Sequence, residues 1–323
     1  MVFVFELSQE YLDLAQQEVL CFFDKPKYEF LAHFVIIKED ISKTKLVFLS
    51  KRLAYTKRIS KFLFDAKQND LLSAIKRFSW KRVYKKDISV KVRGLLYERH
   101  KEIIASVLAQ LPKKKVNLTD PKTRIQFFQI GNKVYATQLL REVKHDFEKR
   151  KAHNRPACHP SAMHPQLTRA MINLALHGRK DGFITDPFVG TGGTILEAHD
   201  MHLKSEGFDI DSWMIHRCKT NLEFFHITKV QIIQADATQI KEKKDFVVAD
   251  LPYGKGTKNI SKTLYKEFFS NLERILKVRA VVCFKDSPNT MAFLAEHFLI
   301  KNTFVVPVHI TMVRRIVVLE KKI

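Results

Sequence analysis

The chain has 323 residues, of which 46% are hydrophobic and 28% are charged. This length is too great for one ordinary compact domain, and the hydrophobic content excludes a wholly disordered chain. No stretch approaches the ~20 uninterrupted apolar residues that a membrane span requires. The cysteines are scattered and form no CxxC pair, so we expect a protein of a reducing, cytoplasmic compartment. They are Cys21, Cys158, Cys218 and Cys283.

The net charge is +22, from 56 Lys and Arg against 34 Asp and Glu. An excess of this size predicts a polyanionic partner, with nucleic acid first and an anionic membrane surface second. A well-solvated surface that only keeps the protein soluble is the remaining interpretation. The distribution favours nucleic acid, because residues 51–150 hold 26 basic and 9 acidic residues whereas residues 1–50 hold 5 and 8. We therefore expect a dedicated binding module in residues 51–150 and no membrane partner.

The first fifty residues are expected to form a small ferredoxin-like α+β domain. Val2–Leu7 is predicted as a strand, and Ser8 as the cap of a helix whose apolar residues recur at helical spacing. Tyr28–Ile37 and Lys45–Leu49 are predicted as two further strands.

The basic segment 51–150 is expected to form a second domain that ends in a linker. Its helices are predicted at Arg52–Phe64, Asp70–Phe78 and Glu98–Leu111. Its strands are predicted at Ile88–Val92 and in a hairpin around Gly131-Asn132, formed by Arg124–Ile130 and Lys133–Thr137.

Residues 151–323 alternate between strand and helix patterns. Strands are predicted near residues 183–187, 205–209, 230–235, 245–250 and 279–284. Helices are predicted near residues 165–177, 194–204, 212–225, 264–276 and 288–297. Phe298–Pro307 and Ile310–Glu320 are predicted as a terminal pair of strands. This alternation predicts a doubly wound, mostly parallel α/β sheet.

A glycine-rich turn follows the first strand of this sheet, in the sequence Asp186-Pro-Phe-Val-Gly190-Thr-Gly192-Gly-Thr194. Glycines at such a turn let the backbone approach a ligand closely. A dinucleotide fingerprint is excluded because Ile195 stands where GxGxxG needs its last glycine, and a phosphate loop would need a Lys-Ser/Thr pair. A tight turn without a ligand is the alternative.

Carboxylates follow the next two strands. Asp209 ends the second strand, where it can accept both hydroxyls of a ribose, while Asp211 or Ser212 is expected to cap the following helix. Asp236 follows the third strand and can accept from an adenine amine. Its alternative role is to cap a helix or close a turn.

The fourth strand ends in Asp250-Leu251-Pro252-Tyr253-Gly254. An exocyclic amine is a poor nucleophile because its lone pair is delocalised into the ring. The Asp250 carboxylate and the Leu251 carbonyl can accept its two hydrogens and so localise that lone pair. Pro252 stiffens the turn, and Tyr253 offers a flat face on which a base can stack. A plain loop after a buried strand is the alternative, but all four motifs lie at the strand ends where such sheets bind ligands.

These residues carry a resemblance to a known family. Residues 164–323 resemble the class I S-adenosylmethionine-dependent methyltransferases that modify amines, and Asp250–Tyr253 matches their (Asp/Asn)-Pro-Pro-(Tyr/Phe) motif at three of four positions, with Leu251 in place of the first Pro. The junction before this region resembles that of archaeal tRNA guanosine-10 N2-methyltransferases; its residues are Arg150, Arg155, Pro156, His159-Pro160 and Pro165–Leu174. Those enzymes carry an N-terminal THUMP domain, an RNA-binding module that the segment opening with Arg52–Arg58 resembles.

The resemblance implies a Rossmann-like methyltransferase domain over residues 151–323, S-adenosylmethionine as cofactor and tRNA as partner. It implies methyl transfer to the N2 amine of a guanosine, at position 10. The cofactor would be held by Asp186, Phe188, Gly190 and Gly192 around its methionine part, by Asp209 at its ribose, and by Asp236 and Ala237 at its adenine. The target guanine would be held by Asp250, Leu251, Pro252 and Tyr253.

Three alternatives stay open at this point: another tRNA guanosine such as position 6, N6-adenine methylation of nucleic acid, and an RNA-binding protein without activity. We expect no metal site, because the spacing of His153, Cys158, His159 and His164 matches no standard set of zinc ligands. A monomer is compatible with the sequence, which leaves the need for an accessory subunit open.

Overall fold

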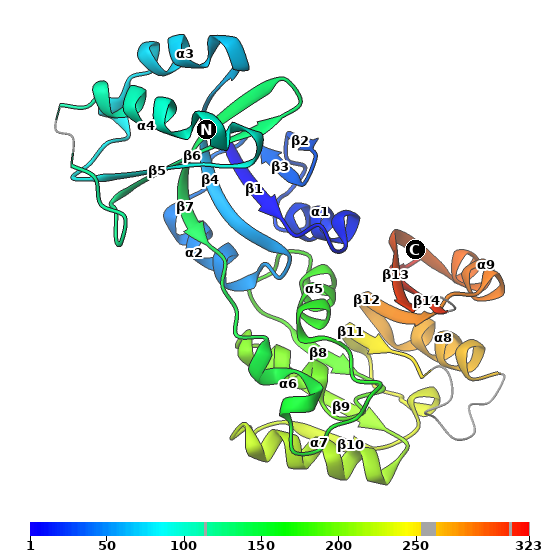
Figure 1. The fold of residues 1–323 in the computed structure, drawn as a ribbon. Coiled ribbons are helices and arrows are strands. Elements are labelled where there is room, and N and C mark those ends of the chain that lie inside the picture. Colours follow the sequence, from blue (N-terminus) through cyan, green and yellow to red (C-terminus); the bar gives the residue numbers. More distant parts are fainter. Residues whose placement is uncertain (113–114, 253–262, 310–311, 323) are drawn as a thin grey trace. The chain divides into compact units, whose positions relative to one another are not determined.

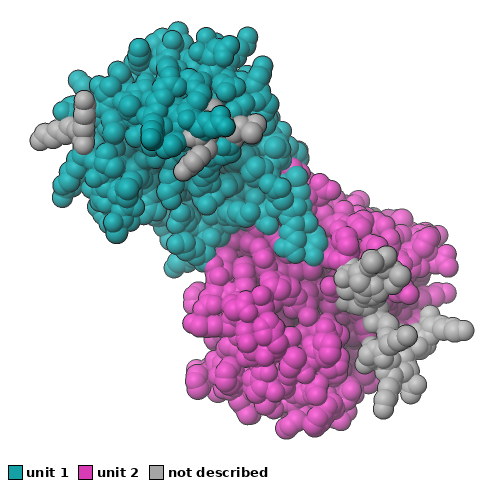
Figure 2. All heavy atoms as spheres, viewed as in Figure 1, with its two compact units in different colours: residues 1–12, 24–51, 56–144 teal, residues 13–23, 52–55, 145–323 magenta. Residues whose placement is uncertain are grey.

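The computed structural model describes residues 1–112, 115–252, 263–309 and 312–322 (Figure 1). The chain divides into two compact units, which Figure 2 colours separately. Unit 1 comprises residues 1–12, 24–51 and 56–144, and unit 2 comprises residues 13–23, 52–55 and 145–323. Among the described residues, no helix is both long and apolar enough to cross a membrane.

Unit 1 is built on a mixed sheet that has seven strands among the described residues, in the order β2-β3-β1-β4-β7-β6-β5. Of these described strands, β5 and β6 pair in parallel, and the other neighbours pair antiparallel. The strands are β1 (Phe3–Leu7), β2 (Tyr28–Leu31), β3 (Phe34–Ile37), β4 (Thr56–Lys67), β5 (Ile88–Val92), β6 (Thr123–Ile130) and β7 (Lys133–Glu142). The helices are α2 (Lys43–Arg52), α3 (Leu71–Arg77) and α4 (His100–Ala109). Buried side chains of α3, α4, β5 and β6, such as Ile75, Val107 and Phe127, share one apolar cluster.

Two predictions for unit 1 are wrong. Lys45–Leu49 lies in α2, where Leu46 and Leu49 are buried one helical turn apart, so the helical spacing outweighs the β propensity of the run. Most of Arg52–Phe64 lies in β4, which pairs with β1 on one side and β7 on the other. This two-sided pairing overrides the local helical pattern.

Other predictions for unit 1 are confirmed or refined by the structure. The hairpin of β6 and β7 around Gly131 is confirmed, as are the strand at Ile88–Val92 and the helices α3 and α4. The run Tyr28–Ile37 forms two strands, since the chain turns at Ala32 with a positive φ of 50°. The three expected domains stay a prediction; strands from residues 1–50 and 51–150 share one sheet here.

Unit 2 contains the predicted alternating region. Its sheet has seven described strands in the order β10-β9-β8-β11-β12-β14-β13, and all pairs are parallel except those made by β14. The strands are β8 (Phe183–Asp186), β9 (Lys204–Asp209), β10 (Gln231–Gln234), β11 (Lys244–Asp250), β12 (Leu276–Lys285), β13 (Phe298–His309) and β14 (Met312–Lys321). The predicted doubly wound sheet is therefore confirmed. Its chain order reverses on either side of β8, the point where such sheets bind ligands.

Helices cover both faces of this sheet. They are α5 (Pro165–Leu176), α6 (Gly193–Asp200), α7 (Ser212–Phe224), α8 (Leu264–Ile275) and α9 (Pro288–His297). Val247, Ala249 and Leu251 of the β11 region pack in the apolar cluster that contains α8. Ile195 and Leu222 belong to a separate cluster with α6 and α7. Val247, Ala249 and Leu251 are alternate residues, so one side of this strand packs against α8, as the pleat of a sheet requires.

Unit 2 also includes two segments from the start of the chain, residues 13–23 and 52–55. The first forms most of α1 (Leu12–Leu20). Its Glu18 is fully buried and accepts hydrogen bonds from the backbone N–H groups of Ala54 (2.7 Å) and Tyr55 (2.9 Å), and from Nδ2 of Asn173 on α5 (2.7 Å). Burial raises the pKa of Glu18, and these donors oppose that rise. Both early segments are thereby fixed to α5, which leads into β8.

Candidate active site

The turn after β8 has the backbone that its glycines predict. Gly190 and Gly192 both lie in the left-handed region, with φ of 48° and 87°. A Cβ added to Gly192 would lie 2.9 Å from Sγ of Cys218. A larger residue at this position would therefore clash with Cys218 and would also have a strained, positive φ. Helix α6 begins directly afterwards at Gly193. The glycine turn, residues 186–194, therefore joins the carboxyl end of β8 directly to the start of α6.

Asp186 ends β8 and is 3% exposed. Its carboxylate accepts from the backbone N–H of Phe188 at 3.0 Å and from the side chain of Thr194. Burial raises the pKa of Asp186 to about 7, and the negative charges of Asp209 and Asp250 raise it further against these hydrogen bonds. The fold therefore brings the ends of β8, β9 and β11 close enough for their carboxylates to interact.

Asp209, at the end of β9, supports the glycine turn. It accepts from the backbone N–H of Gly190 at 3.0 Å and from that of Asp211 at 3.0 Å. Burial raises the pKa of Asp209, and these backbone donors oppose the rise. Asp211 accepts from the N–H of Trp213 at 2.8 Å, which confirms the prediction that it caps α7.

Asp236 lies after β10 and caps a short 3-10 helix, Ala237–Gln239. It accepts from the backbone N–H and the hydroxyl of Thr238, both at 2.8 Å. This is the capping role named above as the alternative to adenine binding. The side chain of Ala237 is buried in the cluster with α8, so only its backbone is suited to contact a ligand. Adenine binding by these two residues stays a prediction.

The Asp250 motif is anchored on both sides. The N–H of Leu251 donates to the carbonyl of Cys283 on β12 at 2.8 Å, and the Leu251 side chain is buried. The carbonyl of Pro252 accepts from the Tyr265 hydroxyl of α8 at 3.1 Å. Burial raises the pKa of Tyr265 to about 12, so this hydroxyl keeps its proton. Tyr253 lies outside the described residues.

Arg314 on β14 is a site residue that the sequence did not reveal. Its Nη1 lies 3.5 Å from Oδ2 of Asp250. No motif surrounds it, and it reaches Asp250 only because β14 returns antiparallel beside β12. Tyr265 was missed for a similar reason, since its position in α8 shows no pattern that separates it from an ordinary core tyrosine.

Arg155 lies beside the start of α6. It is 5% exposed, its Nε donates to the carbonyl of Arg150 at 2.7 Å, and its Nη1 has no hydrogen-bond partner within the described residues. A Cβ added to Gly193 would lie 3.7 Å from this Nη1. A buried guanidinium next to the free N–H groups of a helix start favours an anion. The site thus fits the carboxylate of the expected cofactor.

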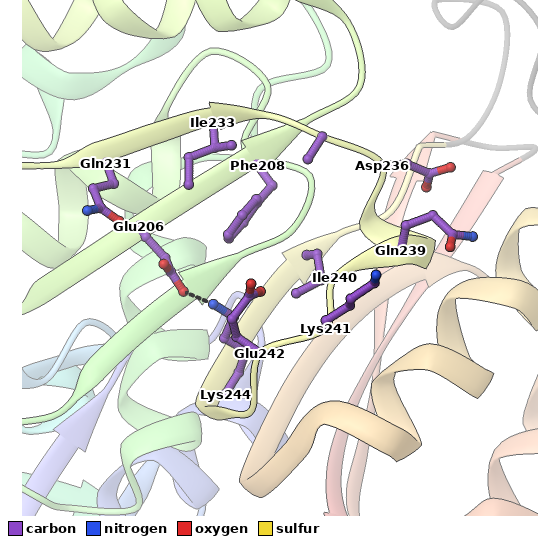
Figure 3. A pocket seen from close by; sticks show the side chains of 11 residues that line it. Glu206, Phe208, Gln231, Ile233, Asp236, Gln239, Ile240, Lys241, Glu242 and Lys244 are labelled. Atoms are coloured by element: carbon purple, nitrogen blue, oxygen red, sulfur yellow. Dashed lines mark ion pairs between the residues drawn. The ribbon is translucent and has the colours of Figure 1, made fainter.

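The structure also contains a hollow of about 410 Å³ beside β9 and β10 (Figure 3). Among the predicted site residues only Asp236 lines it. Its wall includes Phe208, Ile233 and the ion pair of Glu206 with Lys244 at 2.7 Å. The chain passes here from β10 to β11 through a short 3-10 helix, so this part of the sheet lacks the cover of a full helix. The hollow is therefore a feature of the fold next to the site.

The histidines considered as metal ligands have other contacts. Nδ1 of His164 accepts from the N–H of Gln166 at 3.2 Å and caps α5. His159 contacts the hydroxyl of Ser161 at 2.6 Å. Within the part of the chain that the structure describes, no group of three or more His, Cys, Asp and Glu could hold a metal ion.

Comparison with known proteins places this geometry in a family. The family profile described as "RMKL-like, methyltransferase domain" matches residues 152–316. A tRNA (guanine(10)-N2)-dimethyltransferase of Methanothermobacter thermautotrophicus is 31% identical over 287 residues, which cover 84% of each chain. The chain belongs to the family of this tRNA methyltransferase. Another tRNA (guanine(10)-N2)-dimethyltransferase, of Pyrococcus abyssi, is 33% identical over 227 residues, or 67% of this chain and 68% of the relative.

Further matches agree on a methyltransferase fold. TrmN from Thermus thermophilus superposes with a TM-score of 0.55 at 19% identity, covering 100% of both chains. SMU.472, a putative methyltransferase complexed with SAH, gives 0.54 at 12% identity and covers 100% of this chain and 98% of its own. A second profile, described as "DNA methylase", matches residues 4–219 and so ends before Asp250. The expected class I methyltransferase fold is confirmed.

Proposed function

We propose that this chain is an S-adenosylmethionine-dependent tRNA (guanine-N2-)-methyltransferase that acts on guanosine 10. The relatives at 31% and 33% identity carry that activity in their names. The observation that carries the proposal is the position of Asp250 at the carboxyl end of β11, which pairs in parallel with β8, the strand that Asp186 ends before the glycine turn. This neighbourhood supports a site in which catalytic and cofactor-binding groups would lie side by side.

The cofactor supplies a methyl group on a positively charged sulfur. Asp186 and the glycine turn would hold its methionine part, and Arg155 with the start of α6 would hold its carboxylate. Asp209 would accept from its ribose hydroxyls, since each carboxylate oxygen that binds a backbone N–H still has a second lone pair. Asp236 and the backbone of Ala237 would contact its adenine.

Asp250 and Leu251 act on the target amine. The carboxylate and the neighbouring carbonyl accept the two N–H groups of the guanine amine, so the nitrogen lone pair becomes available and is oriented. As the nitrogen bonds to the methyl carbon and the bond from that carbon to sulfur breaks, the Asp250 carboxylate would take the proton that the nitrogen loses. Tyr265 holds the Pro252 carbonyl and so fixes the turn in which these acceptors lie. Catalysis comes from orientation and charge placement.

The charge of the N-terminal part of the chain supports the proposal that tRNA is the substrate. Residues 51–150 hold most of the net positive charge, and Lys81, Arg82, Lys85 and Lys86 are exposed. We assign this segment to a THUMP-like module, in accord with the resemblance of Arg52–Arg58. Phosphate contacts of this kind set the register of the RNA and carry little sequence information. The target base would leave its stack to reach Asp250, as enzymes acting on paired bases require.

N6-adenine methylation is the second candidate. It uses the same four-residue motif, and the match of residues 4–219 to a DNA methylase profile favours it. One assay separates the candidates: methyl transfer from labelled S-adenosylmethionine to an unmodified tRNA transcript, followed by digestion to nucleosides. Labelled N2-methylguanosine or N2,N2-dimethylguanosine supports the proposal. Labelled N6-methyladenosine supports the second candidate, and an absence of label contradicts both.

A further inference from the structure

Asp250 and Arg314 lie on one face of the sheet although they are far apart in sequence. In the strand register, Asp250 of β11 is opposite Cys283 of β12, which is opposite Ile316 of β14. Arg314 precedes Ile316 by two residues, so it faces the same side, and it pairs with Lys285 at the carboxyl end of β12. The guanidinium is therefore held at the edge where Asp250 ends its strand.

The two side chains form a partly buried ion pair. The Nη1 to Oδ2 distance is 3.5 Å, and the side chains of Arg314 and Asp250 are 14% and 22% exposed. The Cys283 thiol beside them is fully buried, and burial followed by the charge of Asp250 raises its pKa well above the ordinary value, with Arg314 opposing. In such poorly solvated surroundings charge placement has a large effect on binding.

This pairing has a direct counterpart among the bases. The Watson–Crick edge of guanine presents the N2 amine and the N1–H as adjacent donors and then O6 as an acceptor. A carboxylate next to a guanidinium presents the complementary groups, and the five N–H donors of an arginine allow contact with a carboxylate and a carbonyl at once. Adenine presents the acceptor N1 in the middle of its edge and has no O6, so the same pair would face mismatched groups.

We infer that Arg314 binds O6 of the target guanine and that the Asp250–Arg314 pair makes the site selective for guanine over adenine. This inference rests on the proposed function and deepens it, because it names a specificity-determining residue in the same site. Asp250 accepts from N2 and N1, and Arg314 donates to O6.

The test compares tRNA transcripts that carry guanosine or 2-aminopurine at the methylated position. 2-Aminopurine keeps the C2 amine but has neither O6 nor the N1–H. For wild type, kcat/KM should be higher with guanosine. Arg314→Met should lower kcat/KM for guanosine roughly 10- to 100-fold, the range of one good base contact, and should change it little for 2-aminopurine. The preference of the variant for guanosine should shrink accordingly.

Arg315→Met is the matched control. Arg315 is the next residue of β14, points to the other face, and is bound to Asp286 at 2.6 and 2.7 Å. This variant should keep the wild-type preference for guanosine. Activity with 2-aminopurine also reports whether the Arg314 variant is folded, because that substrate has no O6 and so makes no contact that the substitution removes.

The outcomes separate this inference from the proposed function. If Arg314→Met lowers kcat/KM by the same factor for both substrates, Arg314 only positions Asp250 and the inference is overturned. If the variant keeps the full wild-type preference, the inference is overturned as well. If wild type itself transfers no methyl group to the guanosine transcript, the proposed function has failed.

Discussion

Replacing Asp186 with Asn should change how the stability of the protein depends on pH. Asp186 is almost fully buried, and its pKa is raised to about 7 by that burial. An aspartate in an unfolded chain has a pKa of about 4. The folded protein therefore binds this proton more tightly than the unfolded chain does. The resulting contribution to the free energy of unfolding is fully present below pH ~4. The contribution is lost as the pH rises through about 7.

The size of the effect follows from the two pKa values. A difference of ~3 at ~1.4 kcal/mol for each unit corresponds to ~4 kcal/mol over the whole range, and to ~2–3 kcal/mol between pH 5 and pH 8. Asn is neutral throughout and its Oδ1 can still accept from the N–H of Phe188. The free energy of unfolding of Asp186→Asn, relative to wild type, should therefore rise by ~2–3 kcal/mol from pH 5 to pH 8.

Urea unfolding followed by circular dichroism, at pH 5, 6, 7 and 8 without cofactor, measures this difference. Asp245→Asn is the control, since Asp245 is an exposed carboxylate on β11, and its difference from wild type should vary little with pH. A difference for Asp186→Asn that stays constant, or falls as the pH rises, would refute the reasoning that Asp186 is held in a poorly solvated position.

Three further predictions concern binding and turnover. Replacing Lys81, Lys85 and Lys86 with Gln should weaken tRNA binding at about 50 mM salt. It should also reduce the slope of log binding constant against log salt concentration by ~1 for each phosphate that the protein no longer neutralises, and an unchanged slope would place the RNA surface elsewhere. Arg155→Gln should weaken S-adenosylhomocysteine binding ~10- to 100-fold in calorimetry but leave 5′-methylthioadenosine, which lacks the carboxylate, nearly unaffected; equal losses would mean a purely structural role. Tyr265→Phe should slow single-turnover methyl transfer ~2- to 10-fold through the freed Pro252 carbonyl, and an unchanged rate would argue against that role.

The catalytic fold could be predicted because each of its signals is local. Strand and helix patterns alternate along unit 2, and Asp186, Asp209 and Asp250 each stand at the end of a strand. In a parallel sheet these ends meet at one edge, so the sequence order alone indicates that the carboxylates gather. The glycine positions 190 and 192 were recognisable for the same reason, since the turn between β8 and α6 requires positive φ.

What could not be predicted depends on contacts between distant segments. The run Arg52–Phe64 resembles a helix locally, and it is a strand because β1 and β7 pair with its two edges. Glu18 looks like a surface residue of an amphipathic helix, yet it is buried against Ala54 and Asn173. Arg314 reaches Asp250 only through the antiparallel return of β14. None of these pairings leaves a periodic or motif signal in the sequence.

The central claim is that the Asp250 carboxylate activates the amine of a guanosine. Single-turnover methyl transfer by Asp250→Ala at saturating tRNA and cofactor, together with tRNA affinity measured on the same preparation, tests it most directly. We expect the transfer rate to fall by roughly 10²- to 10⁴-fold, the contribution of a positioned catalytic group, while tRNA affinity stays within about twofold. A rate close to wild type, or a loss of affinity as large as the loss of rate, would contradict the account.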